Sequence, residues 1–384
     1  MFSTLFGKVF GKGKAEFKCR IGESNLEIPV QSDQTLLQAA LNQGIAFPHN
    51  CRAGGCGECK CRLVTGKVKE LTDKSYLLSG EEMRNNFILA CQAKPRSDLV
   101  VEVKLCEGPS HPVVEVDGVV EQFGLLTHDI MHLTLRLDKA IEFSAGHYAD
   151  VSLLDDLGNE LVTRSYSFAN CPELSGTSGS IEFYIREVSG GLFSGTLFRN
   201  ARVGMRVKVR GPFGNFYLRK AAAPLLFIAG GSGMAPIMAM IKGELQDFSS
   251  KDRDLTIVFG ARSQEDLYLL DEMEQVSKRW RGKFRFVPVL SAEPDSSSWS
   301  GMRGFIGDQL RSIVGPLLAD HHAYLCGPPA MIDTCVEALR NEGVNESVIY
   351  FDKFGDSSLG KEIPQMGQFR TSAQMNREVD VATP

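Results

Sequence analysis

The sequence predicts a multidomain chain made of an α+β roll of the β-grasp kind, an antiparallel β-barrel and a parallel α/β sheet. Strand-like runs flank one short amphipathic helix near the start, short alternating runs separated by turn residues fill the middle, and apolar runs alternate with helical patterns after residue 223. The predicted segments are an extension (1–14), a first domain (15–106), a linker (107–112), a barrel domain (113–222), an α/β domain (223–354) and a mobile tail (355–384).

Composition places the protein among soluble globular chains. It has 384 residues, of which 43% are hydrophobic and 23% are charged. The net charge of −5 and the lack of a long basic run argue against a nucleic-acid partner. Five of the ten cysteines lie between Cys51 and Cys91, which predicts one thiolate site in a reducing, cytoplasmic setting rather than a disulfide scaffold.

The first domain reads as strands around one helix. The helix is expected over residues 32–44, with Asp33 as its N-cap and Gly44 at its end. The first two strands are separated by turn residues that indicate a hairpin. The expected strands are residues 17–22, 26–30, 61–68 and 89–103.

The run CRAGGCGECKC, residues 51–61, carries the chemistry of this domain. Its first three cysteines have the spacing C-x₄-C-x₂-C of plant-type [2Fe–2S] proteins, with one more thiol downstream. A zinc site usually offers two close pairs of ligands, and a redox dithiol needs only C-x-x-C. The glycines let the loop curl and point N–H groups at sulfur, and Cys61 fits a small apolar strand residue. The predicted iron ligands are Cys51, Cys56, Cys59 and Cys91.

The second and third domains differ in the periodicity of their apolar residues. The barrel strands are expected over residues 113–123, 132–138, 147–154, 164–170, 180–188 and 205–214. Residues 221–241 carry no charge and are long enough to cross a bilayer, but Gly-Gly-Ser-Gly and Pro236 interrupt them. A buried strand, a glycine turn and a packed helix are therefore expected there, followed by further strand–helix units of a parallel sheet.

Four stretches together resemble one family: HNCRAGGCGECKCRLVTGKV, RSYS, GGSGMAP and CGPPAM. The chain resembles the reductases of phenol hydroxylase, benzoate dioxygenase and methane monooxygenase over residues 15–354. The resemblance implies a ferredoxin joined to a ferredoxin–NADP⁺-reductase-type module. It also implies electron flow from NADH through FAD and a [2Fe–2S] cluster to a separate oxygenase or hydroxylase. A reductase for a membrane hydroxylase or desaturase, and a redox sensor, are the alternatives.

The RSYS segment, residues 164–167, resembles the family's flavin motif. The resemblance implies that Arg164 binds the pyrophosphate, that Tyr166 stacks on the isoalloxazine ring and that Ser167 lies near flavin N5. FAD rather than FMN rests on the same resemblance. His147 replaces a family glutamine, and a purely structural histidine is an equal alternative. The expected flavin contacts are His147, Arg164, Ser165, Tyr166, Ser167, Gly190, Gly191, Leu192 and Ser194.

GGSGMAP, residues 230–236, follows an apolar strand but lacks the spacing G-x-G-x-x-G. By resemblance it is the nicotinamide-nucleotide loop, whose amides approach a pyrophosphate. Cys326 would lie beside the nicotinamide, although a buried strand-end cysteine is the alternative, and Phe354 would lie near the flavin. The expected nucleotide contacts are Gly230, Gly231, Ser232, Gly233, Pro236, Arg262, Cys326, Gly327 and Pro328, and the expected catalytic residues are Ser167, Cys326 and Phe354.

The choice of nicotinamide follows from the charges after the second strand of this sheet. A 2′-phosphate needs several cations, but Arg262 stands alone before Glu265, Asp266 and Asp271. NADH is therefore favoured, although one arginine does not exclude NADPH.

The first residues carry a separate signal. Apolar side chains fall on one helical face, and the charges before Glu16 are all positive. This pattern suits weak contact of residues 2–13 with an anionic membrane surface or a partner, while three glycines favour a frayed terminus.

Overall fold

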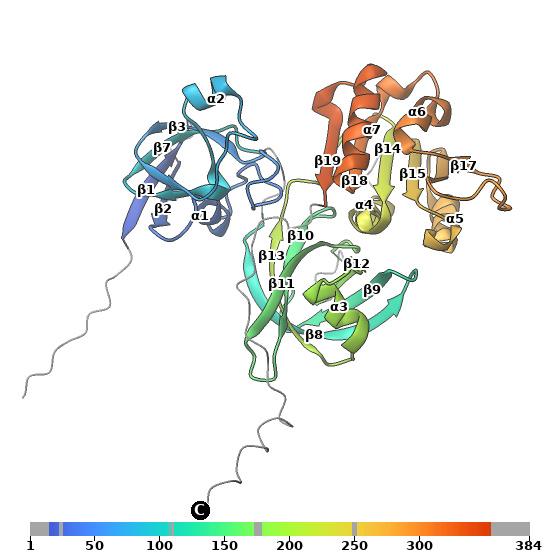
Figure 1. Ribbon diagram of the computed structural model, residues 1–384, viewed down its shortest axis with the longest axis horizontal. Coiled ribbons are helices and arrows are strands. Elements are labelled where there is room, and N and C mark those ends of the chain that lie inside the picture. The colour runs from blue at the N-terminus through green and yellow to red at the C-terminus, as the bar shows by residue number, and fades with distance from the viewer. Residues whose placement is uncertain are drawn as a thin grey trace, which may run out of the picture. The chain divides into compact units, whose positions relative to one another are not determined.

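The computed structural model describes residues 15–22, 26–106, 108, 111–172, 179–247 and 252–354. Their strands form three sheets of five or six strands and one two-stranded sheet (Figure 1). The predicted combination of a β-grasp roll, an antiparallel barrel and a parallel α/β sheet is confirmed. The predicted extension over 1–14 and the tail over 355–384 lie outside the described residues.

The first domain, blue in Figure 1, is built on a mixed five-stranded sheet in which β1 and β7 run parallel. In sheet order the strands are β2 (Leu26–Gln31), β1 (Glu16–Ile21), β7 (Leu99–Glu102), β3 (Lys60–Thr65) and β5 (Phe87–Leu89). The other elements are α1 (Leu36–Asn42), β4 (Val68–Glu70), α2 (Gly80–Arg84), η1 (Ala90–Gln92) and β6 (Ala93–Pro95).

Helix α1 begins at a capping box. The Thr35 hydroxyl accepts a hydrogen bond from the Gln38 N–H, and the Gln38 side chain accepts one from the Thr35 N–H. The expected cap at Asp33 is wrong, because this reciprocal pair satisfies two N-terminal amides and starts the helix two residues later. Gly44 follows the helix with φ +69°, a conformation that suits glycine.

The second domain is an antiparallel sheet curved into a half-barrel. In sheet order its strands are β11 (Glu160–Ser167), β10 (Tyr148–Leu154), β13 (Arg206–Phe213), β8 (Val114–Leu125), β9 (Ile130–Leu137) and β12 (Ser180–Arg186). A bridge between Phe168 and Phe183 joins the continuation of one edge strand to the other edge strand. Helix α3 (Leu192–Asn200) packs Phe193 and Leu197 into the core of this barrel.

The third domain is a parallel sheet with helices on both faces (Figure 1). In sheet order its strands are β17 (Met302–Arg303), β16 (Phe284–Leu290), β15 (Leu255–Ala261), β14 (Leu225–Gly230), β18 (His322–Gly327) and β19 (Ile349–Lys353). Helices α4 (Met234–Gln246) and α5 (Leu270–Arg279) pack on one face, and α6 (Ile306–Val314) and α7 (Pro329–Asn341) on the other. Short turns η2 (Gly231–Gly233), η3 (Gln264–Asp266), η4 (Leu318–Asp320) and η5 (Glu346–Val348) complete it.

The uncharged segment over residues 221–241 forms β14, η2 and the start of α4, as expected. All six residues of β14 are buried, because the sheet is covered on both faces. Among the described residues, no helix is both long and apolar enough to span a bilayer.

Candidate functional site

The four predicted iron ligands come together as two pairs. Cys51, Cys56 and Cys59 lie in the loop between α1 and β3, and Cys91 lies in η1. The side chains of Cys51 and Cys56 share one hydrogen bond, and those of Cys59 and Cys91 share another. Cys51 is exposed, whereas Cys59 and Cys91 are buried. These two thiol pairs match the number of thiolates that a two-iron cluster needs.

Backbone amides of this loop point at sulfur. The N–H groups of Ala53 and Gly55 donate to Cys51 Sγ at 3.4 and 3.2 Å, and the Cys51 N–H lies 3.5 Å from Cys56 Sγ. The hydrogen bond from Cys56, together with these amides, holds the pKa of the Cys51 thiol below its ordinary value. The loop is thus arranged to stabilise negative charge on sulfur, as a [2Fe–2S] cluster requires.

Gly54 closes the loop against Gln92. It has φ +83°, and a Cβ added there would lie 2.9 Å from Gln92 Cγ. The Gln92 amide donates to Cys91 Sγ at 3.5 Å, so this contact joins the loop to the fourth thiol. Cys61 instead lies on β3 with 1% exposure, and burial raises the pKa of its thiol, as expected for a core residue.

Strand β11 carries the segment Arg164–Ser167. Arg164 is exposed and donates to the Thr163 carbonyl at 2.8 Å, and Tyr166 packs 5.0 Å from the ring of Phe193. Ser165 Oγ donates to Asp150 Oδ1 at 2.7 Å. This strand therefore presents a free cationic group and an aromatic ring side by side.

The second expected flavin segment lies at the start of α3. Gly190 has φ +72°, and Gly191 is the N-cap, where no side chain caps the helix amides. Leu192 is exposed, while Ser194 is buried and accepts a hydrogen bond from the Val188 N–H at 3.0 Å. The amides at this helix start are the groups that suit a phosphate.

The nucleotide loop and the end of β18 touch. Strands β14 and β18 are parallel neighbours, with Ala229 opposite Cys326. A Cβ added at Gly233 would lie 2.2 Å from the Cys326 carbonyl oxygen, so only glycine fits there. Ser232 and Pro236 belong to the same strand–turn–helix, and Gly327 and Pro328 begin the turn into α7. Both loops lie at the carboxyl edge of the sheet, where ligands of such sheets bind.

Comparison with known proteins gives three family models in chain order. Models described as a 2Fe-2S iron-sulfur cluster binding domain, an oxidoreductase FAD-binding domain and an oxidoreductase NAD-binding domain match residues 19–96, 117–217 and 227–337. The xylene/toluene monooxygenase electron transfer component of Pseudomonas putida is 38% identical over 328 residues, covering 85% of this chain and 91% of that protein. The chain belongs to the family of reductase components of oxygenase systems.

Other relatives agree. The phenol 2-monooxygenase reductase component of Pseudomonas sp. (strain CF600) is 35% identical over 337 residues, covering 87% of this chain and 93% of that protein. The crystal structure of an Amycolatopsis cytochrome P450 reductase superposes with a TM-score of 0.77 at 31% identity, covering 88% of this chain and 98% of that one. The reductase thus passes electrons from a nicotinamide nucleotide through FAD and a [2Fe–2S] cluster to an oxygenase component.

The three residues expected to be catalytic gather around a carboxylate that the sequence analysis missed. Asp352 lies opposite Cys326 in the pairing of β18 with β19, and its side chain hydrogen-bonds to Ser167 and to Asn50 of the first domain. Phe354 follows two residues later, and its N–H donates to the Gly327 carbonyl at 2.9 Å. An acidic residue directly after the apolar run Ile349–Phe351 is the one sequence signal for this site, because buried carboxylates need partners.

Burial sets the protonation of this centre. It raises the pKa of Asp352 to about 6, against the opposing effect of hydrogen bonds from Asn50 and Ser167. It also raises the pKa of the Cys326 thiol well above its ordinary value, so the reductase holds Cys326 as a neutral thiol. Cys326 is thus both a buried strand-end residue and a neighbour of the nucleotide loop.

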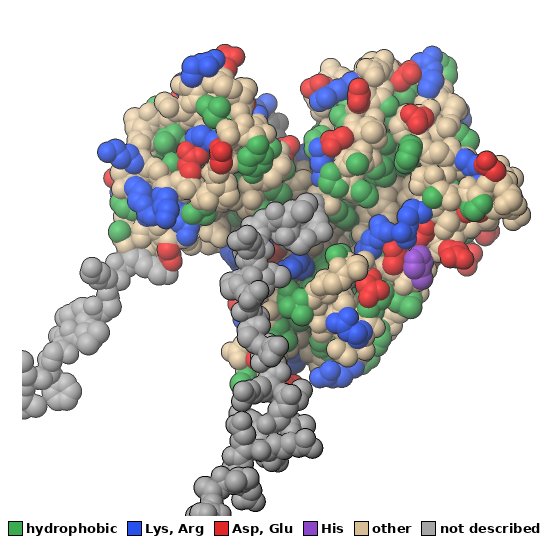
Figure 2. Space-filling model, viewed as in Figure 1, with side chains coloured by type: hydrophobic (Ala, Val, Ile, Leu, Met, Phe, Trp, Pro, Cys, Tyr) green, Lys and Arg blue, Asp and Glu red, His purple; other side chains and the backbone are tan. Residues whose placement is uncertain are grey.

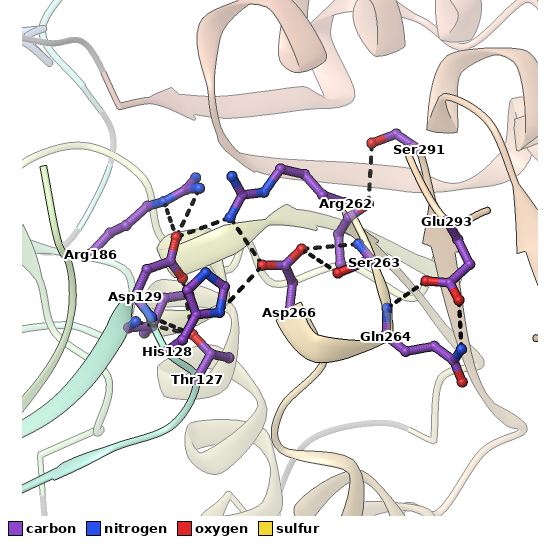
Figure 3. Close-up of polar contacts among 12 residues, drawn as sticks. Thr127, His128, Asp129, Arg186, Arg262, Ser263, Gln264, Asp266, Ser291 and Glu293 are labelled. Atoms are coloured by element: carbon purple, nitrogen blue, oxygen red, sulfur yellow. Dashed lines mark hydrogen bonds and ion pairs between the residues drawn. The ribbon is translucent and has the colours of Figure 1, made fainter. Parts of the chain in front are cut away.

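A cavity of about 480 Å³ extends from the nucleotide loop along the carboxyl edge of the sheet. Two arginines and two aspartates form three ion pairs at its rim (Figure 3). Arg262 lies 3.1 Å from Asp266 and 3.3 Å from Asp129, which the turn between β8 and β9 contributes. Arg186 of β12 lies 3.0 Å from the same Asp129 oxygen. Sequence analysis missed Asp129 and Arg186, because they come from the barrel domain rather than from the nucleotide-binding sheet.

Of the two acidic residues that follow Arg262 most closely, one faces this cavity. Asp266 lines it, and its carboxylate accepts hydrogen bonds from the Ser263 N–H and hydroxyl at 2.9 and 3.2 Å. Glu265 is exposed and is not among the lining residues. On the face shown in Figure 2, acidic and basic side chains are likewise interspersed over the described surface.

His147 immediately precedes β10, and its carbonyl accepts a hydrogen bond from the Phe168 N–H at 3.0 Å, one residue after the segment Arg164–Ser167. Its Nδ1 accepts a hydrogen bond from the Ser144 N–H at 3.2 Å, and its ring lies edge-on to His111, with 5.6 Å between centroids. Its Nε2 is buried without a partner beside a cavity of about 40 Å³ that His49 of the first domain also lines. Burial lowers the pKa of His147 to about 3, so the ring is neutral. A flavin contact for His147 stays a prediction.

Proposed function

We propose that this reductase uses NADH and delivers single electrons to a separate oxygenase or hydroxylase component. The observation that carries the proposal is the meeting of the three domains at Asp352. Its carboxylate joins Asn50, next to the first cluster thiol, with Ser167 of the flavin motif, and its strand neighbour is Cys326. A path from nucleotide to flavin to cluster needs these three segments to be adjacent.

The bound flavin converts a two-electron hydride donor into a source of single electrons, which a [2Fe–2S] cluster accepts one at a time. The residues of this chain position and shield those groups. Ser167 presents its hydroxyl at the buried end of β11, and Cys326 contributes a neutral thiol that repels no hydride. The exposed Arg164 guanidinium and the uncapped amides at the start of α3 suit the flavin pyrophosphate.

The preference for NADH is supported by the charges at the rim of the cavity. Both arginines there are already paired, Arg186 with Asp129, and Arg262 with Asp129 and Asp266. Among the described residues that line the cavity, a 2′-phosphate would meet two carboxylates and no arginine or lysine without an acidic partner, whereas a ribose diol would find carboxylate acceptors. Electrostatics therefore favours the nucleotide without the phosphate.

The site assignments and domain boundaries follow the same scheme. We assign residues 15–106 to the cluster, 113–222 to the flavin and 223–354 to the nucleotide, with 107–112 as the linker. The ligand roles of the four cysteines, the flavin contacts on β11 and α3, and the nucleotide contacts at the ends of β14 and β18 belong to this proposal.

An aromatic-compound oxygenase is the proposed partner, because two relatives, at 38% and 35% identity, are components of xylene/toluene and phenol monooxygenase systems. A cytoplasmic location agrees with ten cysteines that form no disulfide. Residues 2–13, which we propose to contact a membrane surface or a partner, lie outside the described residues. Deleting them tests this proposal through two measurements: co-sedimentation with anionic vesicles and the rate of electron delivery to the oxygenase.

The decisive experiment uses the purified holoprotein. We expect flavin and cluster absorption bands, rapid reduction of ferricyanide and cytochrome c, and a kcat/KM for NADH at least about tenfold above that for NADPH, equal to about 1.4 kcal/mol. A protein without both sets of bands, or one that reduces neither acceptor, would contradict the function. A kcat/KM that favours NADPH would contradict the choice of nucleotide only.

A further inference from the structure

Arg52 occupies a backbone conformation that an arginine rarely adopts. Its φ is +53°, within a loop where the other left-handed positions, at Gly54 and Gly57, are glycines. A left-handed non-glycine residue costs free energy and persists only where surrounding interactions hold it. The side chain of Arg52 therefore has to supply those interactions.

Those interactions are all with the barrel domain. The Arg52 guanidinium donates to Tyr148 Oη at 2.9 Å and to Ser165 Oγ at 3.3 Å, and it forms an ion pair with Asp150. It also lies flat over Phe213, with 3.7 Å from the guanidinium carbon to the ring centroid. The side chains of Arg52 and Asp150 are only 19% and 17% exposed, so the pair is screened from water.

The same contact reaches both cofactor segments. Tyr148 Oη donates to the carbonyl of Asn50 at 2.5 Å, one residue before Cys51. Asp150 lies opposite Ser165 in the pairing of β10 with β11, and Ser165 Oγ donates to its carboxylate. Arg52 thus bridges the loop that carries three of the cysteines to the strand that carries the flavin motif.

We propose that Arg52 is the positioning residue that docks the cluster loop on the flavin strand and so sets the rate of electron transfer between them. The proposal rests on the assigned path from FAD to the [2Fe–2S] cluster. Tunnelling rates fall steeply with distance, so the rate depends on the fraction of molecules in which the loop is docked. Among the described residues, further hydrogen bonds across this interface include those from the Gly214 N–H to His49 Nε2 at 3.0 Å and from Arg210 to Asn42 at 3.2 Å.

The test compares Arg52→Ala with Arg62→Ala in the holoprotein. Arg62 is an arginine of the same domain, but its ion pair, with Glu102, stays inside that domain. Stopped-flow absorbance follows cluster bleaching after NADH is added, and limited proteolysis of residues 103–113 reports undocking without turnover. We expect Arg52→Ala to slow bleaching about tenfold, equal to about 1.4 kcal/mol of docking free energy, and to speed proteolysis by a similar factor. Ferricyanide reduction should stay within about twofold in both variants, because it takes electrons from the flavin and does not need the cluster domain to be docked.

Asp150→Asn provides a second test from the barrel side, away from the iron ligands. If Arg52→Ala loses its cluster, Asp150→Asn must still speed proteolysis and slow bleaching. Arg52→Lys should restore part of the loss, since lysine keeps the charge but not the fork. The proposal would be overturned if Asp150→Asn, or an Arg52→Ala protein that keeps its cluster, showed the same rates of cluster bleaching and proteolysis as the unmodified protein. If the unmodified protein did not reduce ferricyanide, the assigned path from NADH through FAD to the cluster would be contradicted instead. Proteolysis would still report whether the cluster loop is docked.

Discussion

Two glycine-containing loops, residues 51–59 and 230–236, hold different groups and need glycine for different reasons. In the cluster loop, Gly54 and Gly57 have positive φ, so glycine is needed for the shape of the backbone itself. In the nucleotide loop, Gly233 has an ordinary φ of −61°, but no Cβ fits because the end of β18 lies against it. The need for glycine at Gly54 and Gly57 comes from the backbone conformation of the first loop, whereas the need at Gly233 comes from a strand more than ninety residues away in the chain.

The largest expected effect tests the local character of the cluster loop. Cys56→Ser should abolish the cluster absorption bands and lower cytochrome c reduction more than about 100-fold, because one of four ligands is lost. NADH–ferricyanide activity should remain, since it needs only the flavin. Cys61→Ala is the matched control, because Cys61 is buried in β3 and lies two residues from Cys59. Loss of the cluster in the control, or of both activities in a folded Cys56→Ser protein, would contradict the division.

The next prediction tests the close approach in the nucleotide loop. Gly233→Ala should destabilise the protein by about 1–3 kcal/mol and raise the KM for NADH, because the new Cβ would collide with the Cys326 carbonyl. Gly243→Ala, in the same helix, meets nothing closer than 3.7 Å and should stabilise the protein by about 0.5–1 kcal/mol. Denaturant unfolding and steady-state kinetics measure both. Equal effects in the two variants would mean that the contact with β18 does not shape the loop.

The third prediction concerns the nucleotide edge, where the barrel domain contributes charge. Asp129→Asn and Asp266→Asn should each raise kcat/KM for NADPH by about tenfold, or about 1.4 kcal/mol. Asp129→Asn releases Arg186 toward a 2′-phosphate, and Asp266→Asn removes one of the two carboxylates that neutralise Arg262. Glu265→Gln should change it little, since Glu265 does not line the cavity. An effect of Glu265→Gln as large as that of Asp266→Asn would show that general charge, not this network, selects the nucleotide.

The smallest expected effect concerns the contact between the barrel domain and helix α4, which begins within the nucleotide loop. Glu182 lies 3.2 Å from His132 Nε2 and 3.0 Å from Lys242 Nζ, and the His132 hydrogen bond leads the causes that lower its pKa to about 2. A depressed carboxylate pKa adds stability that is present above about pH 4.5 and is lost as the pH falls toward 2.

Glu182→Gln should therefore cost about 1 kcal/mol at pH 7 and flatten this part of the pH–stability curve. Glu274→Gln is the control, because its partner Lys278 lies on the same exposed helix face, and it should cost less than about 0.5 kcal/mol. If the stability of Glu182→Gln still fell as steeply between pH 4.5 and pH 2 as that of the unmodified protein, other carboxylates would be responsible for that loss of stability.

The amino-acid sequence by itself determined the order of the three domains, and it predicts the set of iron ligands. Strand and helix periodicities are local, and three of the four ligands lie within nine residues of chain. The same holds for the strand–turn–helix over 225–246, where apolar residues, glycines and a proline follow one another directly. Local order failed at the start of α1, where two polar residues lie close together and a reciprocal hydrogen bond selects Thr35 over Asp33. It also failed over residues 89–103, where the single expected strand is η1, β6 and β7.

Only the tertiary structure decided how the sites connect. Asp352 meets Asn50 and Ser167, and Asp129 meets Arg186 and Arg262, across separations that no local pattern encodes. The reason is physical: a buried or half-buried charge is stable only beside a partner, and which partner reaches it depends on how sheets from different domains pack. Spacing can therefore identify a ligand set carried on one loop, but a site assembled from three domains is visible only once the chain is folded.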